Sequence, residues 1–246
     1  MNSVGTKNES NRIDWLRKTL AQIPAGSRIL DAGAGEQGKK GFCNHLDYVA
    51  HDFAQYDGKG DARGLQTGEW DQSKLDIVCD ITSIPEPDVS FDAIMCIEVF
   101  EHLPDPLAAI REFARLIRPG GELILTAPFC SLTHFAPYHF YSGFSKYFYE
   151  THLPACGFQV EELVENGNYF EYLAQEIRRI SSVAERYANR HPTLLESLAI
   201  RLVLNMLDRF SAGDRGSHEL LHYGCFVRAT RRDENYSRPY SEPMRP

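Results

Sequence analysis

Residues 28–35 read RILDAGAG, and this stretch decides the fold that the sequence predicts. Residues 28–32, with the apolar Ile29, Leu30 and Ala32, indicate a short buried strand. Gly33 and Gly35 follow at once, and because glycine has no Cβ, the backbone can turn sharply there and a ligand can approach it closely. Gly38 completes a G-x-G-x-x-G spacing, which alone is weak support for a ligand site because many strand-to-helix turns contain glycines.

Along the rest of the chain, short apolar runs alternate with segments of helical periodicity. Strands are predicted at 28–32, 48–52, 75–80, 91–97, 122–127, 157–163 and 224–229, and helices at 11–22, 105–117 and 143–156. This alternation predicts the α/β class: an open, seven-stranded, mostly parallel sheet with helices on both faces. In such a sheet, ligands bind beyond the carboxyl ends of the strands, beside the first strand.

We expect a single domain over residues 1–246. Residues 1–11 and 231–246 are polar and lack periodicity, which predicts flexible ends. Two amphipathic helices fill residues 168–211 and form a helical insertion before the last strand. Their apolar stripes could close a lid over a substrate, form a homodimer interface or pack on the core, and the sequence leaves these three open. It also leaves open the role of the glycine-rich loop 56–74.

The composition excludes several classes of protein. The net charge is −8, which disfavours nucleic acid as a partner because such proteins need basic surface to neutralise phosphates. The N-terminus has no apolar signal segment and no stretch approaches the roughly 20 apolar residues that span a bilayer, so we expect no membrane partner and a cytoplasmic location. The six cysteines form no C-x-x-C pair, which predicts reduced, buried thiols and no metal site.

Carboxylates stand at the predicted ends of the first three strands. Asp31 lies inside the end of the first, Asp52 ends the second, and Asp80 ends the third. A carboxylate in the position of Asp52 can accept hydrogen bonds from both ribose hydroxyls of an adenosine. Asp80 is followed by the apolar Ile81, a pair that suits an adenine with its amino donor and flat ring. Each aspartate could instead cap a loop or a helix, but the ordered set favours an adenosine-containing cofactor.

With these residues the chain resembles a known family, the class I S-adenosylmethionine-dependent methyltransferases. The resemblance covers roughly residues 25–165 and rests on the stretches 29–35, 80–81, 91–94 with EVFEH at 98–102, and 118–121. It is closest to the small-molecule branch that carries an E-V-x-E-H segment after the fourth strand. It implies a Rossmann-like sheet whose last strand is antiparallel, S-adenosyl-L-methionine as the cofactor, and methyl transfer to a small-molecule acceptor.

The resemblance also implies a role for each candidate cofactor residue. The turn at Gly33 and Gly35 would hold the methionine part of the cofactor, with Asp31 supporting it through the backbone or a water. Asp52 would bind the ribose, Asp80 and Ile81 the adenine, and the main-chain carbonyl near Ile97 the cofactor's amino group.

Two other functions remain open at this point. A nicotinamide-dependent oxidoreductase is suggested by the G-x-G-x-x-G spacing, and a non-catalytic S-adenosylmethionine-binding module would keep the fold without the reaction. Asp31 lies two residues before the first glycine, where a carboxylate would repel a diphosphate but tolerate a zwitterionic methionine. This position favours the methyl donor over the dinucleotide.

Segment 129–149, just past the fifth strand, is rich in aromatic residues and should border the transferred methyl group. Aromatic faces could stack on a flat or sugar-like acceptor, although packing against the sheet is the alternative. Histidine titrates near neutrality, so His134 and His139 are the candidate catalytic bases for an acceptor that must lose a proton. His102 is expected to orient the loop after the fourth strand. The accepting atom, oxygen, nitrogen or carbon, is left open.

Overall fold

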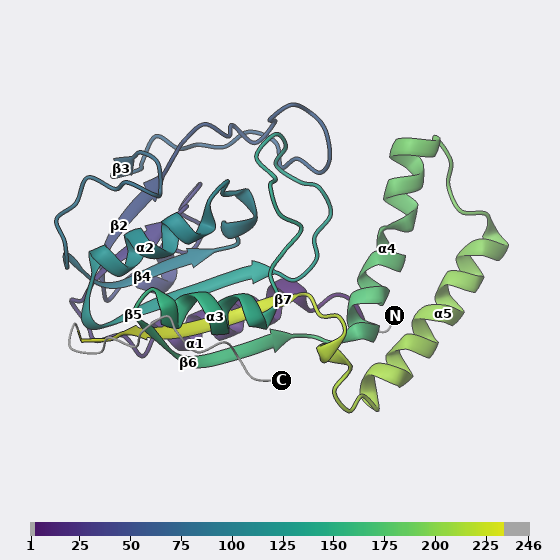
Figure 1. The fold of residues 1–246 in the computed structure, drawn as a ribbon. Helices are drawn as coiled ribbons and strands as arrows, with labels where there is room; N and C mark the ends of the chain where they lie inside the picture. The colour runs from purple at the N-terminus through teal and green to yellow at the C-terminus, as the bar shows by residue number, and fades with distance from the viewer. Residues whose placement is uncertain (1–2, 234–246) are drawn as a thin grey trace.

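The computed structural model describes residues 3–233, which are built around a seven-stranded sheet of order β3-β2-β1-β4-β5-β7-β6 (Figure 1). The strands are β1 (Arg28–Ala32), β2 (Asp47–Asp52), β3 (Ile77–Val78), β4 (Phe91–Ile97), β5 (Ile117–Pro128), β6 (Phe158–Asn166) and β7 (Gly224–Arg231). β1 to β5 pair in parallel, whereas β7 runs antiparallel to both β5 and β6. The predicted Rossmann-like fold with an antiparallel last strand is confirmed.

Helices cover both faces of this sheet, as predicted. The helices are α1 (Asn8–Leu20), α2 (Pro106–Leu116), α3 (Lys146–Ala155), α4 (Tyr169–Ala188) and α5 (Leu194–Ala212), with short 3₁₀ turns at Lys40–Cys43, Phe100–His102 and Ser217–Glu219. Leu16 and Leu20 of α1 pack on one face, and Phe113 of α2 and Leu153 of α3 pack on the other. β4 lies between the two layers and is almost entirely buried, which explains its nearly all-apolar sequence.

α4 and α5 form a helical hairpin that stands away from the sheet, between β6 and β7 in the chain (Figure 1). The insertion predicted at residues 168–211 is therefore helical. α5 begins with a capping box in which Thr193 and Glu196 bind each other's backbone N–H groups. The strands on either side of the insertion are paired up to its base, where Asn166 lies opposite Gly224.

The described part of the N-terminal segment, which the sequence predicted to be flexible over residues 1–11, packs against the helical hairpin, and α1 begins at Asn8. Val4 is buried among Ala174, Leu204 and Leu207 of the helical hairpin. The backbone N–H of Gly5 donates to the Glu171 carboxylate at 2.9 Å. This contact could not be predicted from the sequence, because a single valine shows no periodicity. Residues 1–2 lie outside the described residues.

Most other boundaries differ from the prediction by a few residues, and those of β3, β5 and β7 have a structural reason or limit. β3 is only two residues long because it pairs at the sheet edge with His51 and Asp52 alone. β5 begins at Ile117 and includes Arg118–Gly121, predicted as a stop, because its register with β4 shifts there and Gly120 adopts a positive φ of 76°. Arg231 ends β7, and the predicted tail from residue 234 onward lies outside the described residues.

Within residues 3–233, no helix is long and apolar enough to cross a membrane.

Candidate cofactor and acceptor site

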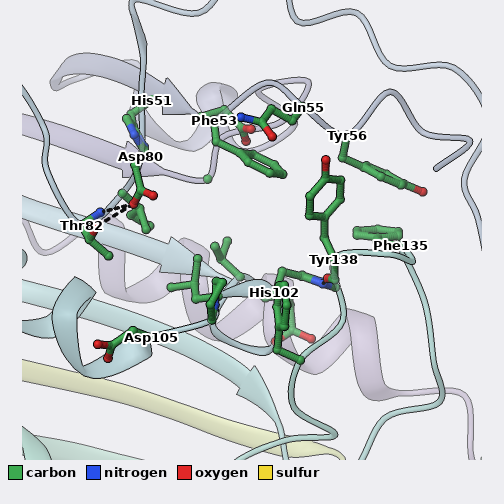
Figure 2. A pocket seen from close by; sticks show the side chains of 18 of the residues that line it. His51, Phe53, Gln55, Tyr56, Asp80, Thr82, His102, Asp105, Phe135 and Tyr138 are labelled. Atoms are coloured by element: carbon green, nitrogen blue, oxygen red, sulfur yellow. Dashed lines mark hydrogen bonds between the residues drawn. The ribbon is translucent and has the colours of Figure 1, made fainter. Parts of the chain in front are cut away.

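A cavity of about 480 Å³ opens beyond the carboxyl ends of β1, β2 and β4 (Figure 2). β1 lies between β2 and β4 in the sheet order, so this is the position where chain connections leave in opposite directions. Its volume is in the range of small-molecule sites. The cavity is lined by Gly33, His51, Asp52, Phe53, Gln55, Tyr56, Trp70, Asp80, Ile81, Thr82, Glu98, Val99, His102, Leu103, Pro104, Asp105, Ala108, Phe135, Tyr138 and Phe140.

The glycine turn after β1 forms one wall. Gly33 has a φ of 86°, and a Cβ on it would lie 2.4 Å from the Val99 side chain, so only glycine fits. The backbone N–H groups of Gly33 and Ala34 donate to the carbonyl of His51 at 2.9 and 2.8 Å, which ties the turn to the end of β2. Gly35 does not line the cavity, but its N–H donates to the Asp52 carboxylate at 2.9 Å.

Asp52 is placed where a ribose-binding carboxylate is expected. It is 5% exposed and lines the cavity at the end of β2. One of its oxygens accepts the Gly35 N–H and the other accepts the N–H of Ala54 at 2.9 Å. Each carboxylate oxygen has further lone pairs, so Asp52 can still accept hydrogen bonds from a ligand. Its role in ribose binding stays a prediction.

Asp80 and the buried Ile81 line the same cavity on the other side of β2. Asp80 Oδ1 accepts the hydroxyl and the backbone N–H of Thr82 at 2.7 and 2.8 Å (Figure 2). These hydrogen bonds, chiefly that from the hydroxyl, lower the pKa of Asp80, so its second oxygen stays a charged acceptor facing the cavity region.

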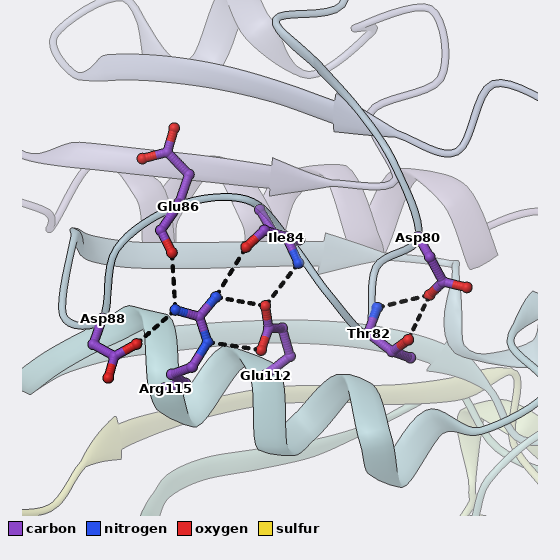
Figure 3. A network of polar contacts seen from close by, with 7 residues as sticks. All are labelled: Asp80, Thr82, Ile84, Glu86, Asp88, Glu112 and Arg115. Carbon is purple, nitrogen blue, oxygen red and sulfur yellow. Dashed lines mark hydrogen bonds and ion pairs between the residues drawn. The ribbon is translucent and has the colours of Figure 1, made fainter.

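The loop that follows Asp80 is held by a polar network around Arg115 of α2 (Figure 3). The guanidinium donates to the Glu112 carboxylate at 2.6 and 2.9 Å and to Asp88 at 2.7 Å. It also donates to the carbonyls of Ile84 and Glu86 at 2.9 and 2.8 Å. Glu112 in turn accepts the N–H of Ile84 at 2.7 Å. The network therefore fixes the loop that carries the predicted adenine-binding residues.

Asp31 and Ile97 are buried and do not line the cavity. Asp31 is fully buried beneath the glycine turn, where its carboxyl accepts the Tyr48 hydroxyl at 2.7 Å. Burial raises the pKa of Asp31, while Lys39 and Tyr48 oppose the rise. Because Asp31 does not line the cavity, its predicted support of the cofactor would have to be indirect, and that role stays a prediction.

Tyr48→Phe tests whether this buried contact stabilises the turn. We expect the free energy of unfolding to fall by about 1–3 kcal/mol, because the variant leaves a fully buried carboxyl without its hydroxyl donor. Urea denaturation at pH 7 measures the change. Tyr147→Phe is the control, since Tyr147 is 60% exposed, and equal midpoints for the two variants would contradict the prediction.

The roof of the cavity comes from two loops, and the sequence did not predict their contact. Leu65 and His134 form a bridge in which the Leu65 N–H donates to the Thr133 carbonyl and the Phe135 N–H to the Leu65 carbonyl, both at 3.0 Å. A Cβ on Gly60 would lie 2.0 Å from the Ala136 carbonyl, so the two backbones touch at a glycine. The loop 56–74 thus packs on the aromatic segment.

This contact brings four cavity residues into the site that sequence reasoning missed. They are Phe53, Gln55, Tyr56 and Trp70. The Tyr56 ring stacks on Phe135 at 4.7 Å between ring centroids, and Trp70 meets Phe135 edge-on at 5.4 Å. A tyrosine and a tryptophan in an otherwise polar, glycine-rich loop were the available signal, because large aromatic side chains seldom lie free in solvent.

Three histidines gather beside this roof. His134, His139 and His102 lie with ring centroids 4.6–6.0 Å apart. Of the three, His102 lines the cavity, whereas His134 and His139, the predicted catalytic residues, lie behind it. Glu101 is 1% exposed, and its Oε1 lies 3.7 Å from Nε2 of both His102 and His134.

Burial and mutual charge set the protonation of this cluster. Burial lowers the pKa of His102 to about 3, and the neighbouring His134 acts in the same direction. Burial also lowers the pKa of His139. For His134 burial opposes protonation, but the Glu101 carboxylate outweighs it and raises the pKa. Burial raises the pKa of Glu101, which His134 counteracts. His102 and His139 are therefore neutral near pH 7 and can offer lone pairs.

A family model described as a methyltransferase domain matches residues 7–201. The chain belongs to this methyltransferase family. The matched range extends through both sides of the cavity, from α1 into α5, and confirms the family resemblance of the glycine turn and the EVFEH segment.

The chain spans about half the length of the curated relatives that it matches. The ubiquinone biosynthesis O-methyltransferase of Xanthomonas oryzae pv. oryzae (strain PXO99A) is 37% identical over 118 residues, which are 47% of this chain and 48% of that protein. The protein of the same name from Dechloromonas aromatica (strain RCB) is 31% identical over 121 residues, 47% of this chain and 49% of its own.

Solved structures share the fold at lower identity. Phosphoethanolamine N-methyltransferase 2 of Haemonchus contortus, in complex with S-adenosyl-L-methionine, has a TM-score of 0.52 at 18% identity and covers 91% of this chain and 53% of its own. Geranyl diphosphate C-methyltransferase of Streptomyces coelicolor A3(2) has a TM-score of 0.52 at 14% identity and covers 94% and 85%. The [4+2]-cyclase SpnF has a TM-score of 0.56 at 18% identity and covers 93% and 84%. The shared fold therefore does not by itself specify the reaction.

Proposed function

We propose that this protein transfers a methyl group from S-adenosyl-L-methionine to a small-molecule acceptor. The observation that carries the proposal is the charge of the cavity wall. The charged side chains that line it are the carboxylates Asp52, Asp80, Glu98 and Asp105, and no lysine or arginine is among the described lining residues. Such a wall suits a cofactor with a sulfonium and an ammonium group, and it opposes the diphosphate of a nicotinamide dinucleotide.

The cofactor residues divide between the two sides of β2. In the proposal, Asp52 holds the ribose and Asp80 with Ile81 holds the adenine, while the turn at Gly33 receives the methionine part. Asp31 and Gly35 act by shaping that turn, and the main-chain carbonyl near Ile97, directly before the cavity-lining Glu98, meets the cofactor's amino group. The bound cofactor supplies an activated methyl group, so the protein mainly has to orient the acceptor and exclude water.

The acceptor would lie under the aromatic roof. Phe135, Tyr138 and Phe140 line this part of the cavity, and Phe53 meets Tyr138 edge-on at 5.0 Å (Figure 2). These ring faces favour a flat or largely apolar acceptor. His134 and His139, predicted as catalytic bases, reach the cavity through His102 and are proposed to act with it as one unit on the acceptor side.

Ligand-dependent thermal unfolding tests the cofactor. S-Adenosylhomocysteine or S-adenosylmethionine at 100 times its Kd is expected to add about 2.7 kcal/mol to stability, whereas NADH is expected to add nothing. Stabilisation by NADH alone would instead support the oxidoreductase.

Methyl transfer from labelled cofactor to acceptors in a metabolite extract separates the enzyme from a non-catalytic binding module. Hydroxylated aromatic compounds are the first acceptors to try, because curated relatives are named O-methyltransferases.

Three further predictions belong to this proposal. The free cysteines agree with a reducing, cytoplasmic location. The net charge of −8 still argues against nucleic acid as a substrate. Several apolar side chains of α5 are exposed, among them Leu194 at 89% and Leu195 at 79%, and this row is the surface that either a lid or a homodimer contact would use.

A further inference from the structure

The histidine cluster beside the cavity has the geometry of a metal-binding site. His102, His134 and His139 each present one ring nitrogen, and these three nitrogens lie within 4.8 Å of one another. Nitrogen ligands of a tetrahedral zinc ion, with bonds of 2.0–2.1 Å, lie about 3.4 Å apart. The three ring nitrogens therefore need to approach one another by up to about 1.4 Å to share one ion, a shift that side-chain rotation can supply.

Backbone carbonyls orient two of these rings. The Nδ1–H of His102 donates to the Tyr138 carbonyl, and the Nδ1–H of His134 donates to the Leu132 carbonyl at 2.8 Å. These bonds fix the tautomer in which the lone pair of Nε2 is free. Metal-binding histidines in proteins are oriented in the same way, by a hydrogen bond from the nitrogen that does not bind the metal.

Three buried polar atoms at this place have no hydrogen-bond partner among the described residues: Nε2 of His102, Nδ1 of His139 and Oε2 of Glu101. Leaving such atoms unpaired costs about 1–3 kcal/mol each. Glu101 is 1% exposed, and the 3.7 Å between its Oε1 and Nε2 of both His102 and His134 is too long for a hydrogen bond. This separation of 3.7 Å is instead close to that between two ligand atoms bound to one ion. A simple ion pair between Glu101 and His134 would leave the other two histidine nitrogens unexplained.

We propose that His102, His134 and His139 bind one divalent transition-metal ion, beside the buried carboxylate of Glu101. Imidazole nitrogens with one carboxylate suit Zn²⁺ and its first-row neighbours, whereas Mg²⁺ prefers oxygen ligands. The sequence predicted no metal site because its cysteines form no C-x-x-C pair, and that prediction did not consider the three histidines, of which His102 lies far along the chain from the other two. The roof segment brings them together.

The ion would fasten the roof of the cavity to the end of β4. Glu101 and His102 belong to the 3₁₀ turn after β4, whereas His134 and His139 lie on the aromatic segment on either side of Phe135 and Tyr138. Metal binding would therefore fix the two aromatic rings against the cavity. The site is argued from these side chains alone, and only its effect on the acceptor rests on the proposed function.

Calorimetric titration of the chelator-treated protein with ZnCl₂ tests the site. We expect one Zn²⁺ per chain, with affinity about tenfold or more lower in His134→Gln and in His139→Gln. His191→Gln is the matched control, because its imidazole is 69% exposed and outside the cluster, and it should bind as the wild type does. X-ray absorption of the Zn²⁺-loaded protein should show nitrogen and oxygen neighbours at about 2.0–2.1 Å with imidazole rings beyond them.

Two outcomes would overturn the proposal: no saturable Zn²⁺ binding, or binding that both cluster variants leave unchanged. Preference for Mg²⁺ over Zn²⁺ at this site would also contradict it. The added stability from S-adenosylhomocysteine, measured in each variant, shows that the variant is folded. If the wild type does not bind that ligand, the proposed function fails, but the Zn²⁺ titration still decides the metal site.

Discussion

Asp52→Ala is expected to weaken the binding of S-adenosylhomocysteine about 100-fold. Asp52 lines the cavity with a carboxylate that is 5% exposed, so hydrogen bonds from two ribose hydroxyls would form there with little competition from water. Hydrogen bonds to a charged acceptor contribute about 1.5–3 kcal/mol each, and a loss of about 3 kcal/mol corresponds to about 100-fold in Kd. Isothermal titration calorimetry measures the change directly.

Asp52 also accepts hydrogen bonds from the N–H groups of Gly35 and Ala54, so the experiment must separate the loss of ribose binding from the loss of support for the glycine turn. Asp52→Asn keeps one side-chain oxygen and is expected to fall between the wild type and the alanine variant. Unfolding of each variant without ligand reports any loosening of the turn. A folded Asp52→Ala protein with unchanged affinity would show that the ribose assignment is wrong.

Glu112→Ala is expected to lower the free energy of unfolding by about 2–4 kcal/mol at pH 7. The substitution removes the acceptor for the Ile84 N–H and leaves the Arg115 guanidinium without its closest carboxylate. Burial alone would raise the pKa of Glu112, but the hydrogen bonds from Arg115 and Ile84 outweigh it and lower the pKa below its ordinary value of 4.5. The stability that the ionised Glu112 carboxylate contributes is therefore fully present above its unfolded-state pKa. It is lost as the pH falls through the lower folded-state pKa.

Urea denaturation at pH 7 and in acid measures the loss of stability and its pH dependence. The difference in free energy of unfolding between Glu112→Ala and the wild type should be smaller in acid than at pH 7. Asp14→Ala is the matched control: Asp14 and Arg17 have the same spacing on α1, at 3.3 Å, but are 65% and 58% exposed. Affinity for S-adenosylhomocysteine should also fall in Glu112→Ala, because the network holds the loop after Asp80. Equal urea midpoints for the two variants would mean that the network does not hold the loop.

The sheet could be predicted from the sequence because its signals are local. Each buried strand is an apolar run, and Gly33 stands where only glycine fits. The strand-end residues Gly33, Asp52, Asp80 and Ile81 lie along one cavity, since the carboxyl ends of neighbouring parallel strands meet at one edge. Periodicity also located the helical hairpin, although it said nothing of Val4, whose burial depends on residues far along the chain.

The acceptor side could not be predicted in the same way. Its roof depends on Leu65 pairing with His134, two positions in loops without periodicity. The same pairing brings Tyr56 and Trp70 onto Phe135. His102 was expected only to orient a loop, yet it is the histidine of the cluster that lines the cavity. Such long-range contacts between loops leave no repeating pattern in the sequence.

The pairing of Asn166 with Gly224 has a consequence for how this protein can diverge. The chain departs from the sheet and rejoins it at opposite positions of one antiparallel pair, so everything between these two residues takes the place of an ordinary hairpin turn. Descendants of this chain can lengthen, exchange or lose α4 and α5 without reordering a strand or disturbing the edge of the sheet where Asp52 and Asp80 lie. Such changes must still keep or replace the contacts of the hairpin with Val4 and Gly5 and the hydrogen bond from the Tyr172 hydroxyl to the Cys130 carbonyl.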